Sequence, residues 1–233
     1  LSVDNVRRTF SVQVTPSRKD KLISIITDHL NSNRLSDVES SKLAGQLSFA
    51  QCAFFGRVGR AYLHPIYARS KQGGSSTLDD RLVNALNWWV KILKLGVFAR
   101  VEPLKRVPTK KVLAYTDAAG TGGTGFNIYT DNEDFFLSHK IRGIDQSDNL
   151  INVLETLAPL IMIKLAGSTL RGSQPIIFID NTSAQSALQR GYSRKPWLCD
   201  IASEFWLTCA MYNLSPWFER VHSNVNIAAP SPR

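Results

Sequence analysis

The fold is decided by the stretch Tyr115-Thr116-Asp117-Ala118-Ala119-Gly120-Thr121-Gly122-Gly123-Thr124-Gly125-Phe126. The apolar run before it, residues 112–115, predicts a β-strand that ends on the carboxylate of Asp117. A glycine-rich turn and a second β-rich run follow. Glycine has no side chain, so the backbone of this turn can approach a ligand closely. The pattern therefore predicts a carboxylate at a strand end, beside a turn that leaves room for a ligand.

Two more acids interrupt apolar segments further along the chain. Glu155 lies in the mostly apolar stretch 150–160, which predicts a helix, and Asp180 ends the apolar strand Ile176–Ile179. Each acid also has an ordinary interpretation: Asp117 could open a turn, Glu155 could be a polar stripe, and Asp180 could cap the next helix. Ligands of α/β sheets bind at the carboxyl ends of strands, and three acids meeting there would repel one another unless cations held them. Hard oxygen donors without His or Cys suit Mg²⁺ or Mn²⁺.

The composition is that of a globular protein with a basic bias. The chain has 233 residues and a net charge of +9. Residues 1–104 hold fifteen Lys or Arg against eight Asp or Glu, so this half is expected to bind a polyanion. No apolar run approaches the roughly 18 residues of a membrane span, so we expect no membrane partner. The three widely spaced cysteines form no metal-ligand pattern, and we expect them to be buried thiols in a reducing intracellular compartment.

The first half of the chain, residues 1–104, is predicted to be a small all-α helical domain. One helix begins at Thr15-Pro16, a second long one runs from the capping box at Ser36–Glu39 to about Ala68, and a third begins after Asp79. Glycines within the second run could allow close packing or a break. The Trp88-Trp89 pair could stack on bases, but helical spacing favours a core position. Phe98–Lys110 contains two prolines and a charge cluster, which indicates a linker.

The second half, residues 105–233, has the pattern of a different fold class. It predicts an α/β fold with a mixed five-stranded sheet and flanking helices. The expected strands are 111–117, 123–130, 135–141, 175–180 and 216–221, and the expected helices are 147–166, 182–190 and 196–212.

This order of acids and elements resembles the ribonuclease H fold. Asp117 with its glycine-rich turn, Glu155 in the next helix and Asp180-Asn181 after the next strand look like the first three acids of that family. The closing segment Phe218–Arg233 is similar to the last motif of retroelement ribonuclease H domains, roughly Val-x-Ser-x-x-Asn-x-Ala-Asp-x-x-Ser-Arg. The helical segment Leu43–Arg60 resembles the region after the polymerase palm of retroelement reverse transcriptases, and the tyrosine-recombinase (DIRS-like) group is one candidate.

The resemblance implies two-metal hydrolysis of the RNA strand of an RNA/DNA hybrid. Asp117 would bridge two Mg²⁺ or Mn²⁺ ions, Glu155 and Asp180 would hold the nucleophile-side ion, and position 229 would serve the other. His222 is a candidate for assisting product release. The resemblance and the positive charge together give these candidate nucleic-acid contacts: Gly120, Asn181, Arg18, Lys19, Lys21, Arg57, Arg60, Arg69, Lys71, Arg194 and Lys195. Arg57 and Arg60 are expected to share a helix face.

One departure from the family pattern stands out. Ala229 occupies the position of the fourth acid, which implies a weakened second metal site and impaired turnover. The leading hypothesis is therefore the C-terminal part of a reverse transcriptase, without fingers and palm, whose remaining parts would be its partners. The alternative is a non-catalytic ribonuclease H-like domain that binds nucleic acid or acts as a scaffold. A third possibility is a helical interaction module joined to an unrelated α/β fold.

Overall fold

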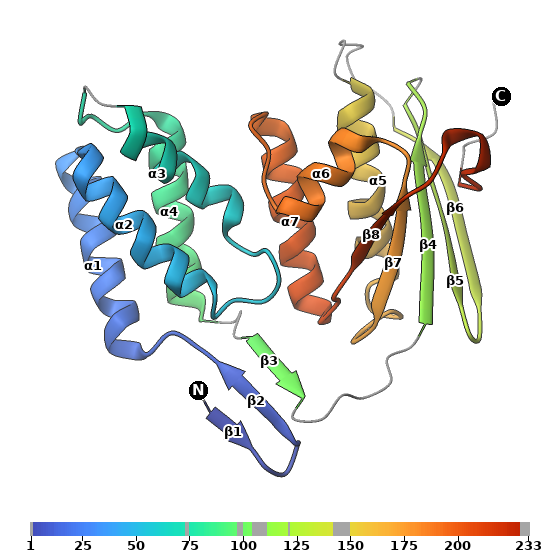
Figure 1. The fold of residues 1–233 in the computed structure, drawn as a ribbon, viewed down its shortest axis with the longest axis horizontal. Helices are drawn as coiled ribbons and strands as arrows, with labels where there is room; N and C mark the ends of the chain where they lie inside the picture. The colour runs from blue at the N-terminus through green and yellow to red at the C-terminus, as the bar shows by residue number, and fades with distance from the viewer. Residues whose placement is uncertain are drawn as a thin grey trace. The chain divides into compact units, whose positions relative to one another are not determined.

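The computed structural model describes residues 2–72, 75–96, 100–103, 111–120, 122–141 and 150–228. The chain divides into two compact units, Leu1–Val107 and Pro108–Arg233. The first unit contains most of the helical segments predicted for the N-terminal half, and the second contains the sheet that carries the three acids (Figure 1).

Four helices build the body of the first unit: α1 (Pro16–Ser32), α2 (Asp37–Gln51), α3 (Arg60–Gln72) and α4 (Asp80–Leu95). The starts of α1, α2 and α4 lie where the sequence predicted them, although Thr15 makes no capping hydrogen bond with its side chain. Ser36 and Glu39 form both halves of a capping box, and the Asp79 carboxylate accepts a hydrogen bond from the Leu82 amide at 2.8 Å. Asp79 is thus a helix cap, as the sequence indicates.

The long helix predicted from Ser36 to about Ala68 is wrong, because the structure breaks it after Gln51. Gly56 and Gly59 have positive φ values of 55° and 87°, which favour glycine. A Cβ atom at Gly59 would lie 3.0 Å from the Trp89 ring, so this glycine also allows close packing. The premise that Arg57 and Arg60 share a helix face fails with it, since Arg57 lies in the turn before α3.

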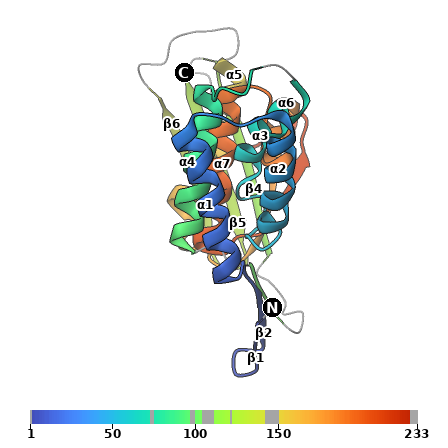
Figure 2. The same ribbon diagram turned by 90° about the vertical axis from the view of Figure 1, so that its left-hand side faces the viewer.

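Three short strands complete the first unit, and the sequence did not predict them. They are β1 (Ser2–Asp4), β2 (Thr9–Val12) and β3 (Arg100–Pro103), paired antiparallel in that order. Strand β3 lies within the segment interpreted as a linker, and residues 98, 99 and 104–110 of that segment lie outside the described residues. Figure 2 shows the β1–β2 hairpin extending away from the helices of its unit.

The core of the first unit forms where α4 packs on α1 and α3, and α3 packs on α2. Ile26, Leu47, Leu86 and Trp89 are fully buried there. Trp88 stacks on Tyr62 with ring centroids 4.5 Å apart. Trp89 is therefore a core residue, in agreement with its helical spacing.

The second unit is built on a five-stranded mixed sheet in the order β6-β5-β4-β7-β8. Strands β4 (Lys111–Ala118), β5 (Gly123–Thr130) and β6 (Asp134–Lys140) are antiparallel to their neighbours in this group. Strands β7 (Gln174–Ile179) and β8 (Trp217–Arg220) extend the sheet in parallel from β4. This confirms the predicted α/β fold with a mixed sheet.

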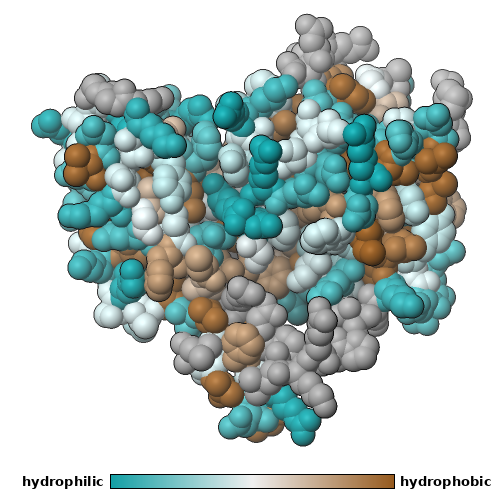
Figure 3. Space-filling view, viewed as in Figure 1, coloured by the Kyte–Doolittle hydropathy of each residue, from teal (hydrophilic) through white to brown (hydrophobic). Residues whose placement is uncertain are grey.

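Three helices that pack on one another cover one face of this sheet: α5 (Leu150–Ala166), α6 (Thr182–Arg190) and α7 (Pro196–Tyr212). Helix α5 lies against β4 and β5, and α6 lies against β7 and β8 (Figure 1). Residues 147–149, which the sequence assigned to the start of α5, lie outside the described residues. Large apolar side chains remain exposed on this unit, among them Phe136, Trp217, Val225 and Ile227, and Figure 3 shows apolar residues gathered on its visible face.

The three cysteines, all in described parts of the chain, form no disulfide, and only Cys209 is buried; Cys199 is half-buried and Cys52 is exposed. The prediction of three buried thiols is therefore wrong for Cys52. Among the helices that the structure describes, none has the length and apolar character needed to cross a bilayer.

Candidate metal centre

Three separate elements of the second unit each deliver one carboxylate to the same place. Asp117 lies near the carboxyl end of the central strand β4, Glu155 lies in the second turn of α5, and Asp180 directly follows β7. Because β4 and β7 are parallel neighbours, their carboxyl ends lie at the same edge of the sheet. The packing of α5 on β4 then brings Glu155 over that edge.

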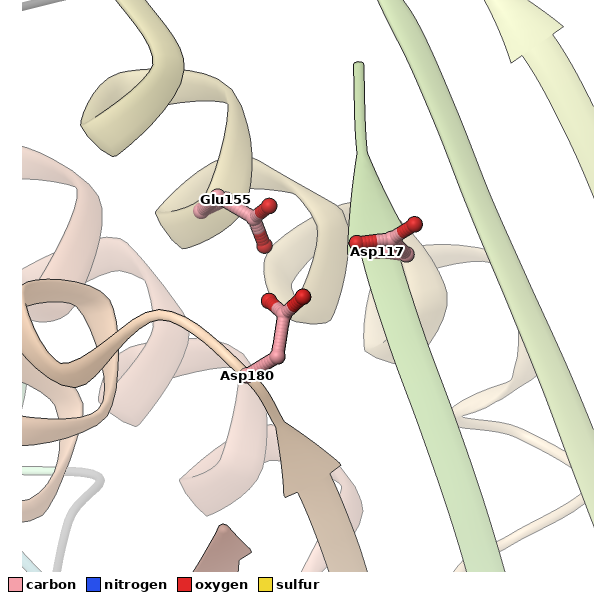
Figure 4. A group of neighbouring side chains, drawn as sticks. All are labelled: Asp117, Glu155 and Asp180. Carbon is pink, nitrogen blue, oxygen red and sulfur yellow. The ribbon is translucent and has the colours of Figure 1, made fainter. Parts of the chain in front are cut away.

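The three side chains converge as the sequence predicted. One oxygen from each of Asp117, Glu155 and Asp180 lies within 4.8 Å of the others. Figure 4 shows their carboxylates facing a common space, with Asp117 on β4, Glu155 on α5 and Asp180 at the end of β7. Glu155 and Asp117 are buried, at 4% and 8% exposed, and Asp180 is half-buried.

This arrangement is electrostatically costly. Burial raises the pKa of Asp117 to about 6, and the Asp180 charge adds to the shift. Burial also raises the pKa of Glu155 to about 9, with further contributions from the charges of Asp180 and Asp117. At neutral pH the metal-free cluster therefore retains a proton on Glu155, since deprotonating it would place a third negative charge at the site.

The donor set fits a divalent cation. Oε2 of Glu155 is buried without a hydrogen-bond partner, although buried polar atoms in folded proteins are nearly always paired. All three donors are carboxylate oxygens, the ligand type that Mg²⁺ and Mn²⁺ prefer. A cation there would satisfy the unpaired oxygen and displace protons from the acids.

The end of the described chain lies beside this cluster. Gly125 is the β5 partner of Asp117, and a Cβ atom at Gly125 would lie 2.7 Å from the Ala228 carbonyl oxygen. The buried Asn226 amide donates to the Thr116 carbonyl at 3.0 Å, and its Oδ1 accepts from the Ala228 amide at 3.3 Å. Residues 226–228 are thus fixed to β4 and β5 beside Asp117, and Gly125 provides the space for them.

The other predicted residues of the second unit have various surroundings. Gly120 is exposed in the β4–β5 turn with open space around it. The Asn181 side chain caps α6 by accepting hydrogen bonds from the Ser183 and Ala184 amides, and its NH₂ group donates to Asn152 at 3.2 Å. His222 is exposed just after β8. Ala229 lies outside the described residues.

Sequence reasoning missed Asn152, which connects two parts of the site. Asn152 precedes Glu155 by three residues on α5, so the two share a helix face, and its bond to Asn181 joins α5 to the start of α6. The signal in the sequence was a polar residue one turn before the acid, in a mostly apolar helix.

The predicted basic contacts differ in how available they are. Arg18 is exposed on α1 with its guanidinium 4.4 Å from the centre of the Phe49 ring, and Lys19 is half-buried. Arg57 and Arg60 are half-buried, and Lys21 and Lys71 are exposed. Arg194 and Lys195 are exposed in the segment before α7. Arg69 is wrong as a candidate phosphate contact because it is buried and donates to the Ser75 and Thr77 carbonyls.

Comparisons with known proteins give weak structural likenesses. No family model matches the chain, and no curated protein matches it. The N-terminal RNase H domain of a Mycobacterium tuberculosis protein is 15% identical, with 51% of this chain and 86% of that chain covered and a TM-score of 0.38. RNase H1 of Halobacterium salinarum is 13% identical, with 52% and 90% covered and a TM-score of 0.40. LC11-RNase H1 in complex with an RNA/DNA hybrid is 14% identical, with 51% and 88% covered and a TM-score of 0.38.

Proposed function

We propose that the second unit is a ribonuclease H-type nuclease that hydrolyses the RNA strand of RNA/DNA hybrids within a retroelement reverse transcriptase. The observation that carries this proposal is the convergence of three carboxylates from β4, α5 and the end of β7, with oxygens within 4.8 Å of one another. A buried acid cluster at the carboxyl ends of sheet strands suits metal-assisted phosphodiester hydrolysis.

Each acid has a distinct task in this proposal. When bound, Mg²⁺ or Mn²⁺ would neutralise charge at the scissile phosphate and promote attack by water. Asp117, on the central strand β4, would supply oxygens to both ions. Glu155 and Asp180 would help to hold the ion that promotes attack by water, and Glu155 would give up its proton when the metal binds.

Ala229 makes the nuclease impaired as the sequence stands. Ala228 contacts Gly125, which pairs with Asp117, and residue 229 directly follows it in the chain. An acid at this position would supply the fourth carboxylate, and alanine supplies no donor. The same observation favours the alternative function, a ribonuclease H-like domain that binds nucleic acid without cleaving it or serves as a scaffold.

The first unit is proposed to hold the substrate. Its excess of basic residues would contact phosphates, with exposed Arg18 as the leading candidate. The remaining parts of a reverse transcriptase would be its partners. A hybrid substrate of this kind would place the protein in the cytoplasm or the nucleus.

Cleavage of an end-labelled RNA/DNA hybrid in Mg²⁺ tests the proposal. We expect slow or no cutting by the chain as it stands, and a gain of cutting in Ala229→Asp. Ala229→Asn is the matched control, since it adds similar bulk without the charge. Adding Asp117→Asn to Ala229→Asp should abolish the gained activity, and a DNA/DNA duplex should remain uncut because it lacks the 2′-hydroxyl group.

The outcomes separate the two functions. Cutting by Ala229→Asp that depends on Asp117 supports the nuclease. Tight hybrid binding without cutting in any variant supports the binding domain. If no variant binds or cuts the hybrid, both functions are contradicted. That result would favour a helical interaction module joined to an unrelated α/β fold.

A further inference from the structure

Strand β6 forms a long regular edge of the second unit. All seven residues, Asp134–Lys140, pair with β5 in an unbroken register, without a bulge or a proline. In the sheet as far as the structure describes it, no strand pairs with the outer side of β6. Folded proteins usually protect such edges, because free amides and carbonyls of an exposed strand bind other strands.

The backbone groups that point outward can be identified from the β5–β6 ladder. The Ile141 amide donates to the Gly122 carbonyl at 2.9 Å, and the Glu133 carbonyl accepts from the Thr130 amide at 3.2 Å. Odd-numbered residues therefore point their amides and carbonyls toward β5. Because the direction alternates along an antiparallel strand, the even-numbered residues direct theirs to the free edge: Asp134, Phe136, Ser138 and Lys140.

We propose that β6 pairs antiparallel with β6 of a second copy of this chain, in a register centred on Leu137. This register opposes Asp134 to Lys140 of the second copy and Phe136 to Ser138 of the second copy. Twofold symmetry repeats both pairs, so every outward-pointing amide and carbonyl of the strand finds a partner. The two sheets then join into one.

Charge complementarity selects the second copy as the occupant of this edge. The strand carries an acid at one end and a lysine at the other, so the antiparallel pairing places opposite charges together twice. A register shifted by two residues still allows the inter-strand backbone hydrogen bonds. It places Asp134 opposite Ser138, however, so Lys140 no longer faces Asp134 of the second copy. A shift of one residue sets outward groups against odd-numbered residues, which point to β5.

The same register brings together the exposed aromatic side chains of the two strands. Phe136 is 86% exposed. In the symmetric pairing, the two copies of Phe136 lie diagonally across the new ladder on one face of the sheet, which is within reach of aromatic side chains. The two copies of Leu137 lie directly opposite each other on the other face.

Sedimentation equilibrium of the full chain and its charge variants tests the proposal. The chain should form a dimer. Asp134→Lys and Lys140→Asp should each weaken it about tenfold, because each turns two attractive pairs into repulsive ones. An equimolar mixture of the two variants should form heterodimers with the original affinity, since both opposed pairs then have opposite charges. Asp131→Lys is the matched control, because it makes the same charge change in the turn before β6 and should leave the dimer unchanged.

A backbone variant tests the pairing independently of charge. Ser138→Pro removes an amide that points to the free edge and leaves the β5–β6 ladder its donors, so the fold should persist by circular dichroism while the dimer is lost. A chain that remains monomeric at the highest attainable concentration would overturn the proposal. So would a dimer that survives Ser138→Pro, or charge variants whose mixture fails to regain affinity.

Discussion

Each unit of this protein buries charged side chains, but the partners of these side chains differ between the two units. In the first unit, Arg69 is 9% exposed, donates to the Ser75 and Thr77 carbonyls, and lies 3.8 Å from the Asp79 carboxylate. In the second unit, Asp117 and Glu155 are similarly buried, and the charges nearest to them are other carboxylates.

This difference in partners indicates that the Arg69 charge has a structural role and that the charges of Asp117 and Glu155 have a functional one. Arg69 has acceptors on the segment that leads into α4, so its burial stabilises that connection. Among the residues that the structure describes, no basic side chain lowers the pKa of either buried acid, so the cluster destabilises the metal-free fold. The contacts of Arg69 account for its burial, whereas a buried cluster of like charges favours the binding of a cation.

The largest expected effect comes from removing the structural charge. Arg69→Met should lower the free energy of unfolding by about 2–4 kcal/mol, because it leaves two carbonyls without their donor and removes the ion pair with Asp79. Urea unfolding measures this loss. Lys71→Met, on the same helix but exposed, is the matched control and should change stability by less than about 0.5 kcal/mol. Equal effects of the two substitutions would show that Arg69 does not hold the connection.

The functional charges should make stability depend on pH and metal together. The folded-state pKa values of Asp117, about 6, and Glu155, about 9, lie above the ordinary values of 3.8 and 4.5. Their contribution to stability is therefore fully present below about pH 4 and is lost as the pH rises through 6 and then through 9. In EDTA, the contribution of these acids to the unfolding free energy should fall over this range.

A divalent cation should reverse that trend, since it binds the deprotonated acids. At a Mg²⁺ concentration of about 100 times its dissociation constant, the gain is about 2.7 kcal/mol. Glu155→Gln should remove most of the Mg²⁺ gain at pH 8 and flatten the pH dependence in EDTA. Glu133→Gln, at an exposed acid in the turn before β6, should leave both unchanged. A Mg²⁺ gain that persists in Glu155→Gln would place the metal elsewhere.

The sequence predicted what local chemistry determines. The helix caps at Ser36 and Asp79 satisfy amides of their own first turns, and the acids at 117 and 180 follow apolar strands directly. In each case, the residues that predict the feature lie within a few positions of it in the sequence. The mixed sheet followed from the same local patterns, and the parallel pairing of β4 with β7 then brought the acids together.

The features that the sequence missed depend on distant partners. Strand β2 forms because Phe10 pairs with Glu102, and the α2–α3 break includes Gly59, which packs on Trp89. Asn226 hydrogen-bonds to the Thr116 carbonyl, 110 residues earlier in the chain. Short exposed strands have weak periodicity, and a lone glycine or asparagine gives no sign of which distant group it will meet.

Substitution of Asn226 should have a smaller effect, and it tests whether this residue supports cleavage as well as stability. Asn226→Ala should cost about 1–2 kcal/mol of unfolding free energy, because the buried Thr116 carbonyl and the Ala228 amide lose their partner. In the Ala229→Asp background, it should also lower hybrid cleavage by more than the loss of folded protein explains. Asn224→Ala, an exposed neighbour, should leave both stability and cleavage unchanged. Cleavage that follows stability alone would make the closing segment purely structural.

The smallest expected effect comes from changing the exposed basic side chains of the first unit, which, unlike Arg69, are open to solvent. Arg18 lies over the exposed Phe49 ring and is available to a phosphate. Arg18→Gln should leave stability nearly unchanged and weaken hybrid binding to a similar degree for all sequences. The slope of log affinity against log salt should fall by about 0.9 if one phosphate contact is lost. Arg7→Gln, in the β1–β2 turn and paired with Asp4 at 3.8 Å, is a control for the lost charge alone. An equal fall in slope for both variants would show that the first unit attracts nucleic acid through its overall charge, without a phosphate site at Arg18.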